Sequence, residues 1–332
     1  MKHESSSMKK ILHSTILLAA LNANPVLSAD LSTIFDTNSY KATSTLVPKS
    51  ALSFGLGGNL NYSVYGTQYI YAVGNGTFFD DRANTLAVGY AQGSNKIGMS
   101  NQVRIAPSAQ IKYFQYLDNS NLLFGANYAY SYLHSRSSTP NVTVPQWGSS
   151  TIGDGTSLNL FGSDGKRIGA TGNALASSYQ VSINHQMQFT PFVGYGFSKG
   201  FFYIGGGPSL SQVQTNVINL IGFAQMRGQP TDQSGVAQNF SGHHWVFGGA
   251  ATAGFTYFLT PSWYVDLNYT YSQPRTPTSN YWSTFYNPVS SRVFLAGTLT
   301  GNSYGSITSH SFTASMNYAI DLAKSMPIHA KF

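Results

Sequence analysis

The feature that most constrains this chain is a strict two-residue alternation in residues 52–64, which read LSFGLGGNLNYSV. Apolar residues or glycine occupy the even positions, and small or polar residues occupy the odd positions. A period of two residues is typical of an extended strand with one apolar and one polar face. The question it raises is whether the apolar face points inward to a core or outward to lipid.

The same alternation recurs in seven further segments, so the sequence predicts eight strands. Three short turns lie at residues 118–121, 198–200 and 259–262. Four long connections alternate with them, covering about residues 66–102, 134–178, 215–244 and 273–309. Outer-membrane barrels have short periplasmic turns, long extracellular loops and an even number of antiparallel strands. The pattern therefore predicts an all-β fold, an eight-stranded antiparallel up-and-down transmembrane β-barrel.

Charge content indicates which face meets lipid. Only 9% of the residues are charged, whereas about a quarter are charged in a typical soluble domain. A soluble barrel would carry charges on its outward face, but the charges on the predicted strands are Arg104, Lys112 and Asp266. We expect these three side chains in the lumen, which eight strands leave just wide enough for side chains. There they either form a functional ionic network or neutralise one another and plug the barrel.

The N-terminal segment has the pattern of a secretory signal peptide, because Lys9 and Lys10 precede an apolar stretch that ends in small residues. An anchor helix is the alternative, although the apolar run is too short to span a bilayer. The expected organisation is a signal peptide at 1–29, a periplasmic lead-in at 30–50, the outer-membrane barrel with its four extracellular loops at 51–320, and a C-terminal tail at 321–332.

Two absences exclude classes of chemistry. The chain has no cysteine, so it forms no disulfide and no cysteine-ligated zinc site. Its net charge of +7 is scattered and forms no Lys/Arg run, and an exported chain would not meet nucleic acid, so nucleic acid is not an expected partner.

Histidines near the predicted extracellular rim are the candidates for haem or metal binding. His243 and His244 are the cofactor candidates, and His134 and His310 fall near the same rim. Adjacent histidines in a strand point to opposite faces, so polar rim residues without a ligand are the simpler interpretation, and we predict neither a cofactor nor a metal. His185 lies on the predicted apolar face with no acid patterned beside it, so the sequence predicts no enzyme.

Three segments, residues 190–210, 248–272 and 309–320, resemble the outer-membrane β-barrel domain family of opacity proteins, small surface antigens and some haemin-binding surface proteins. The likeness covers roughly residues 50–320 and consists of turns and strand patterns. It implies a location in the bacterial outer membrane, among lipid and lipopolysaccharide. Members of this family usually end at an aromatic residue that closes the last strand, whereas Ile320 is followed here by a tail.

The functional expectation is a surface protein with the barrel as its anchor. Its loops would serve envelope structure, adhesion or interaction with host or cell-surface ligands. Segments rich in Tyr and Asn, such as SNYWSTFYNP at residues 279–288, are candidate contact sites because tyrosine buries a large area at low entropy cost. A narrow, porin-like diffusion pore and a haem or metal receptor are the alternatives.

Overall fold

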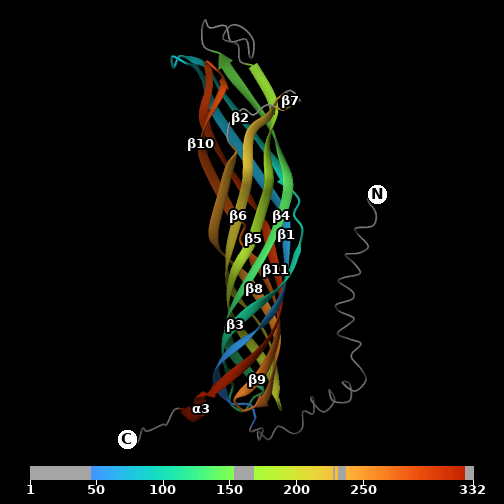
Figure 1. Cartoon of the computed structure of the whole chain (residues 1–332). Coiled ribbons are helices and arrows are strands. Elements are labelled where there is room, and N and C mark those ends of the chain that lie inside the picture. Colours follow the sequence, from blue (N-terminus) through green and yellow to red (C-terminus); the bar gives the residue numbers. More distant parts are fainter. Residues whose placement is uncertain (1–45, 153–167, 227–228, 231–236, 326–332) are drawn as a thin grey trace, which may run out of the picture.

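The computed structural model describes residues 46–152, 168–226, 229–230 and 237–325, which form a long, twisted tube of β-strands (Figure 1). In these ranges the elements are β1 (Ser50–Asp80), β2 (Thr85–Ile97), β3 (Gln102–Tyr116), β4 (Leu122–Ile152), β5 (Ile168–Phe197), β6 (Gly200–Met226), β7 (Gln229–Pro230), β8 (Gln238–Thr260), β9 (Trp263–Pro274), β10 (Thr278–Ser290), β11 (Val293–Asp321) and α3 (Leu322–Ser325).

The lower half of the tube is a closed ring of eight antiparallel strands. The ring runs β1, β3, β4, β5, β6, β8, β9 and β11, and it closes where residues 51–65 of β1 pair with residues 307–321 of β11. The strands follow one another along the chain, and three short turns join them at the predicted positions. The prediction of an eight-stranded antiparallel up-and-down barrel is confirmed. We call this ring the membrane tier.

The four connections predicted as long loops are mostly β-strand in their described parts, so the prediction of loops is wrong there. β1 continues to Asp80 and returns as β2, β4 and β5 extend far above the ring, and so do β6 and β8. β10 and the first half of β11 fill the last connection. These extensions form an upper tier about as tall as the membrane tier (Figure 1). The sequence predicts strands only where apolar and polar residues alternate clearly, and these strands continue beyond those segments.

β-bulges at one height separate the two tiers. The pairing of β1 with β11 shifts by one residue between Tyr65 and Gln68, and the pairing of β5 with β6 shifts between Ile183 and His185. Because side chains alternate with a period of two, one extra residue exchanges the inward and outward faces. On β1 the buried positions are therefore odd up to Tyr65 and even from Gln68.

This exchange changes what fills the tube. In the membrane tier, apolar side chains point outward, such as Leu56 at 73% and Ile105 at 85% exposure, and polar ones point inward. In the upper tier, an apolar cluster that includes Ile70, Val181 and Val213 fills the interior. The lower half is thus built for lipid, and the upper half has an apolar core like that of a water-soluble protein.

The upper tier also has eight strands, but its strand order differs. β2 takes the place of β3 between β1 and β4, and β10 takes the place of β9 beside β11. In the described residues β10 has a ladder only with β11, and β8 above Gly248 has a ladder only with β6. A seam without backbone pairing therefore separates β8 from β10.

Candidate functional site

A buried ion pair lies near the short-turn end of the bore. Lys112 on β3 and Asp266 on β9 are 2.6 Å apart, Nζ to Oδ1, and neither side chain is exposed. The Tyr203 hydroxyl accepts a hydrogen bond from Lys112 Nζ at 3.0 Å and lies 3.0 Å from Asp266 Oδ2. Asp266 also accepts hydrogen bonds from Thr256 at 2.8 Å and Gln110 at 3.3 Å. Since every group has partners, the pair is a structural lock and not a free acid or base.

Arg104 does not join this pair. It lies opposite Asn61 in the register of β1 and β3, whereas Lys112 lies eight residues away, opposite Ser53. Its side chain is exposed. Arg104 therefore does not share one lumenal group with Lys112 and Asp266. In the described residues β3 is paired only with β1 at that height, which leaves the Arg104 side chain open to solvent.

Aromatic side chains surround the ion pair and close the bore. The plug contains Phe114, Tyr116, Phe192, Phe201, Tyr203, Phe258 and Tyr264. Glycines beside the rings make room for them. Gly254 lies directly opposite Tyr203 on the neighbouring strand, and a Cβ there would overlap the Tyr203 ring, whereas a Cβ on Gly196 would overlap Tyr116. Small residues on the inward face of a narrow barrel thus hold the aromatic rings in place.

Above the plug, hydrogen-bonded neutral side chains cross the bore. Asn59 Nδ2 on β1 donates to Ser131 Oγ on β4 at 3.1 Å, and Gln186 Nε2 on β5 donates to Ser272 Oγ on β9 at 3.1 Å. The apolar cluster of the upper tier begins directly above them. The described bore is therefore filled by aromatic, polar and apolar side chains in succession.

The candidate haem ligands lie on opposite sides of the wall. His243 on β8 is exposed, whereas His244 points toward the interior, as expected for neighbours in a strand. His134 and His310 lie beside tyrosines, with Tyr269 Oη 2.8 Å from Nδ1 of His310. Among the described residues, no three His, Asp or Glu side chains come together as a metal site would require.

His185 lies among aromatic side chains at the upper end of the apolar band. Its Nδ1 is 2.8 Å from the hydroxyl of Tyr130, and its ring lies near Tyr132 and Trp245. Ten residues separate it from Tyr195 at the other edge of β5, which is about 25 Å at roughly 2.5 Å of height per residue in a tilted strand. Aromatic residues therefore mark both edges of a band as thick as the apolar band of an outer-membrane barrel.

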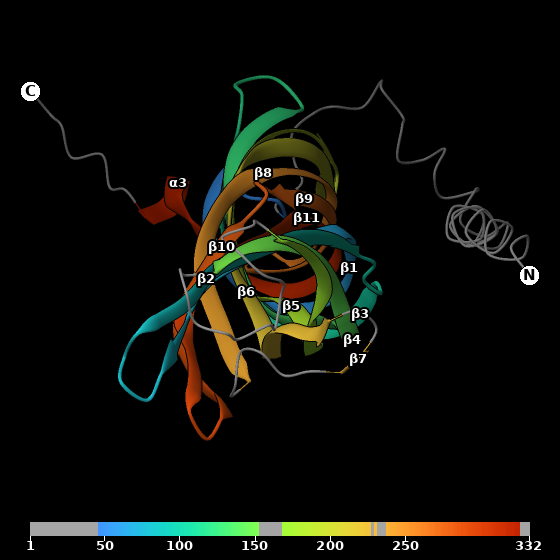
Figure 2. The same ribbon diagram turned by 90° about the horizontal axis from the view of Figure 1, so that it is seen from above.

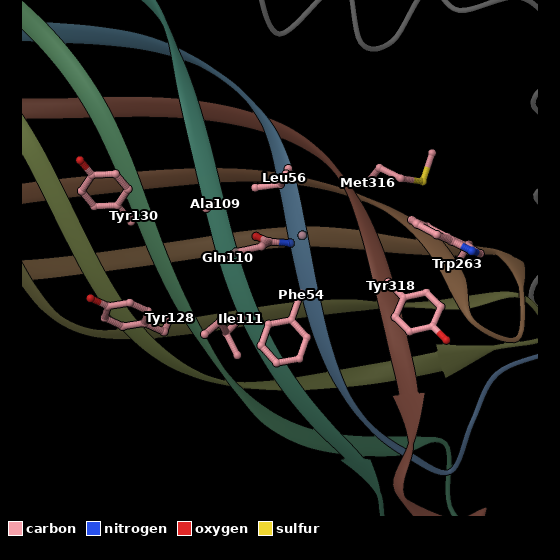
Figure 3. A pocket seen from close by; sticks show the side chains of 11 residues that line it. Phe54, Leu56, Ala109, Gln110, Ile111, Tyr128, Tyr130, Trp263, Met316 and Tyr318 are labelled. Carbon is pink, nitrogen blue, oxygen red and sulfur yellow. The ribbon is translucent and has the colours of Figure 1, made fainter.

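The outward wall of the membrane tier has one large apolar hollow (Figure 3). It has a volume of about 660 Å³. Ala109 lies opposite Leu56 on its floor, and Phe54, Ile111, Tyr128 and Tyr318 stand around it. Its lining is almost entirely apolar, as is the rest of the outward wall of the membrane tier.

These features place the protein in the membrane. In the ring up to Ser108 of β3, every strand has backbone partners on both sides, which is the condition for a β-structure to cross a bilayer. Its outside is apolar with aromatic edges, its inside is polar, and its strand number is even, as in bacterial outer-membrane barrels. The chain is an outer-membrane β-barrel protein. In the described ranges, no helix has the length and hydropathy of a membrane-crossing helix.

The upper tier has an outward-facing aromatic surface on the sheet β10–β11–β1–β2, whose side chains are exposed or half-buried. We call it the aromatic face, and it comprises Tyr69, Tyr71, Phe79, Tyr90, Trp282, Tyr286, Phe294 and Tyr304. Trp282 is 65% and Tyr286 56% exposed, and the rings of Tyr69 and Tyr304 stack at 5.0 Å. From above, the β1–β2 and β10–β11 hairpins that carry this face project beyond the rim of the barrel (Figure 2).

Sequence reasoning found only part of this surface. The predicted contact segment, residues 279–288, contributes Trp282 and Tyr286, but Tyr281 of the same segment is buried. The remaining aromatic residues lie in the connections that the sequence predicts as long loops. The available signal was the alternation of Tyr69 and Tyr71 with Ile70 and Ala72, which continues the period of two past the predicted end of the strand.

No family model matches the sequence, and no curated protein matches it. Among solved structures, it is similar to the outer membrane protease OmpT from Escherichia coli, with 11% identity, a TM-score of 0.31, and coverage of 82% of this chain and 96% of that one. Ail, the attachment invasion locus protein of Yersinia pestis, gives 11% identity, a TM-score of 0.24, and coverage of 74% and 99%. The outer membrane protein OprG from Pseudomonas aeruginosa gives 10% identity and a TM-score of 0.25, with coverage of 83% of this chain and 97% of that one. With TM-scores this low, the activities of these proteins do not transfer to this chain.

Proposed function

We propose that this protein is a contact protein of the bacterial surface, in which the membrane tier is the anchor and the upper tier holds the aromatic face away from the membrane for adhesion or interaction with another surface. The observation that carries the proposal is the aromatic face itself. Large exposed apolar patches are uncommon on soluble surfaces and mark interaction sites. Tyrosine and tryptophan are the residues that dominate binding at interfaces.

Other features of the chain support this role over the alternatives. A rigid, apolar core under the aromatic face means that its side chains are ordered before any partner arrives, which reduces the entropy lost on binding. The filled bore does not favour a porin-like pore. The opposed orientations of His243 and His244 do not favour joint ligation of a haem iron.

Attachment of whole cells tests the proposal. A laboratory strain that displays the protein is compared with the same strain carrying an empty vector, on an epithelial monolayer and in self-aggregation. We expect display to raise attachment in at least one assay, and the Trp282→Ser, Tyr286→Ser and Tyr304→Ser triple variant to lose most of the gain. Trp245→Ser is the matched control, because Trp245 is exposed on β8, a strand that carries no residue of the aromatic face. Equal attachment by the triple variant and the wild type would refute the proposal.

A further inference from the structure

The seam between β8 and β10 contains a small pocket through the wall of the upper tier. Its volume is about 280 Å³. The residues on its outer side are Asn239, Ser241, Asn280 and Trp282. Deeper in, Ser279 and Thr215 line it, and Phe240 and Tyr281 approach each other across the seam with ring centroids 4.8 Å apart. No lining residue carries a charge.

The Ser279 hydroxyl, which lines this pocket, is buried without a hydrogen-bond partner. Ser279 is 5% exposed, and its Oγ has no hydrogen bond. Nε2 of His244, which points inward beside Gly242, is likewise buried without a partner. A buried polar atom without a hydrogen bond costs about 1–3 kcal/mol, and such atoms are rare in native proteins. A polar ligand in the pocket would satisfy the Ser279 hydroxyl.

The spacing of the seam restricts what the ligand can be. Exposed strand edges commonly bind an added peptide strand, but here the edges are too close together. Some Cα atoms of β8 and β10 lie within 8 Å of each other, whereas an inserted strand needs about 4.8 Å on each side, or roughly 9.6 Å in all. A compact ligand therefore fits the seam, and an inserted strand does not.

We propose that this pocket binds one neutral sugar residue of a glycan. Asparagine amides and serine hydroxyls both donate and accept hydrogen bonds, which matches the hydroxyl groups of a sugar. The exposed ring of Trp282 offers an apolar surface for its C–H face, and the lack of charge disfavours phosphates and carboxylates. The pocket adjoins the aromatic face through Trp282, so this inference rests on the proposed function and assigns a ligand class to it.

Binding to purified protein tests the inference. The full chain is placed in nanodiscs free of lipopolysaccharide, and saturation-transfer NMR is recorded with the methyl glycosides of glucose, galactose and N-acetylglucosamine. N-acetylneuraminic acid is the charged comparison. We expect at least one neutral sugar to bind at least tenfold more tightly than the acid. A separate arm with de-acylated lipopolysaccharide core and O-polysaccharide distinguishes the bacterium's own glycans from host glycans.

Two variants locate the binding. Ser279→Ala and Trp282→Ala should each weaken the best sugar about tenfold, the equivalent of one lost hydrogen bond or ring contact. Ser138→Ala and Trp147→Ala, both at exposed sites on β4, should leave it unchanged. Absence of transfer from every neutral sugar, or equal binding by the Ser279→Ala variant and the wild type, overturns the inference. If cells still attach through the aromatic face in that case, only the sugar assignment fails.

Discussion

At the scale of single residues, the buried lysine and aspartate decide how the bore is held. Lys112 and Asp266 lie on strands far apart in the sequence, and their contact joins β3 to β9 across the barrel. The ring of Tyr203 lies 4.1 Å from Lys112 Nζ, which adds a cation–π contact. The two buried charges compensate each other, whereas either charge alone would be buried without a partner and would strongly destabilise the fold.

Lys112→Met should destabilise the barrel by about 3–5 kcal/mol, because Asp266 is left buried without a cation. The double variant Lys112→Met, Asp266→Asn removes both charges and should recover most of the loss. Urea unfolding in detergent micelles, followed by tryptophan fluorescence, measures both. If Lys112→Met is as stable as the double variant, the unpaired Asp266 carboxylate does not destabilise the barrel.

Buried tyrosines in the upper tier make its stability sensitive to alkali. Burial raises the pKa of Tyr179 to about 12, against an ordinary value of 10, and burial also raises the pKa of Tyr281. The folded chain therefore keeps these protons after the unfolded chain has lost them. The stabilisation is complete below pH 10 and is lost as the pH rises through 12.

Tyr179 alone should account for about 2–3 kcal/mol between pH 10 and 12. Tyr179→Phe should make the upper tier less dependent on pH across that window, with Tyr286→Phe as the exposed control. Chymotrypsin resistance of the upper tier after pH jumps, or urea unfolding at pH 9, 10 and 11, measures the slope. Parallel slopes for wild type and Tyr179→Phe would contradict the assignment.

At the scale of elements, a β-bulge allows one strand to expose apolar side chains to lipid in the membrane tier and to bury them in the core of the upper tier. Below its bulge, β1 turns Leu56 and Leu60 outward to lipid, and above it turns Ile70 inward. β6 reaches the same result without a bulge, because its inward residues change from Ser209 and Ser211 to Val213. The chain therefore uses both devices, a shift in register and a change in residue type, at one height.

Deletion of Thr67 should remove the bulge of β1 and force its upper half into the opposite orientation. Ile70 and Ala72 would then face water, and Tyr69 and Tyr71 would face the core. We expect the membrane tier to form and the upper tier to become cleavable by chymotrypsin. Deletion of Arg82 in the tip turn is the control. If the Thr67 deletion variant resists chymotrypsin as well as the wild type does, the bulge does not determine which side chains of β1 face the core.

The membrane tier could be predicted from sequence, and the upper tier could not, for a physical reason. Each membrane strand faces lipid on one side and packed polar side chains on the other, so its residues alternate sharply in polarity, as in residues 52–64. In the upper tier, residues such as Thr77, Asn75 and Gly76 give little contrast between faces. The alternation predicts Arg104, Lys112 and Asp266 in the lumen. The structure brings Lys112 and Asp266 together, whereas Arg104 lies where β3 has lost its second neighbour, and the sequence does not reveal that position.

At the scale of the whole molecule, a closed ring continues into a taller tube that holds its tip away from the membrane. From Gln68 to Asp80, β1 rises twelve residues above its bulge, which is about 30 Å at roughly 2.5 Å per residue. The aromatic face lies along this height. The three short turns and α3 lie at the opposite end of the tube (Figure 1). The orientation of the barrel therefore decides whether the aromatic face meets the outside.

Single cysteines test this orientation, because the chain has none of its own. Asp81→Cys lies in the exposed turn at the tip between β1 and β2, and Lys199→Cys lies in the exposed short turn between β5 and β6. A membrane-impermeant maleimide should label the first variant in intact cells and the second only after the outer membrane is opened. The reverse pattern would place the aromatic face in the periplasm and remove the basis for surface contact. Labelling of both sites in intact cells, or a protein that stays folded and monodisperse without detergent, would show that hydrocarbon does not surround the membrane tier.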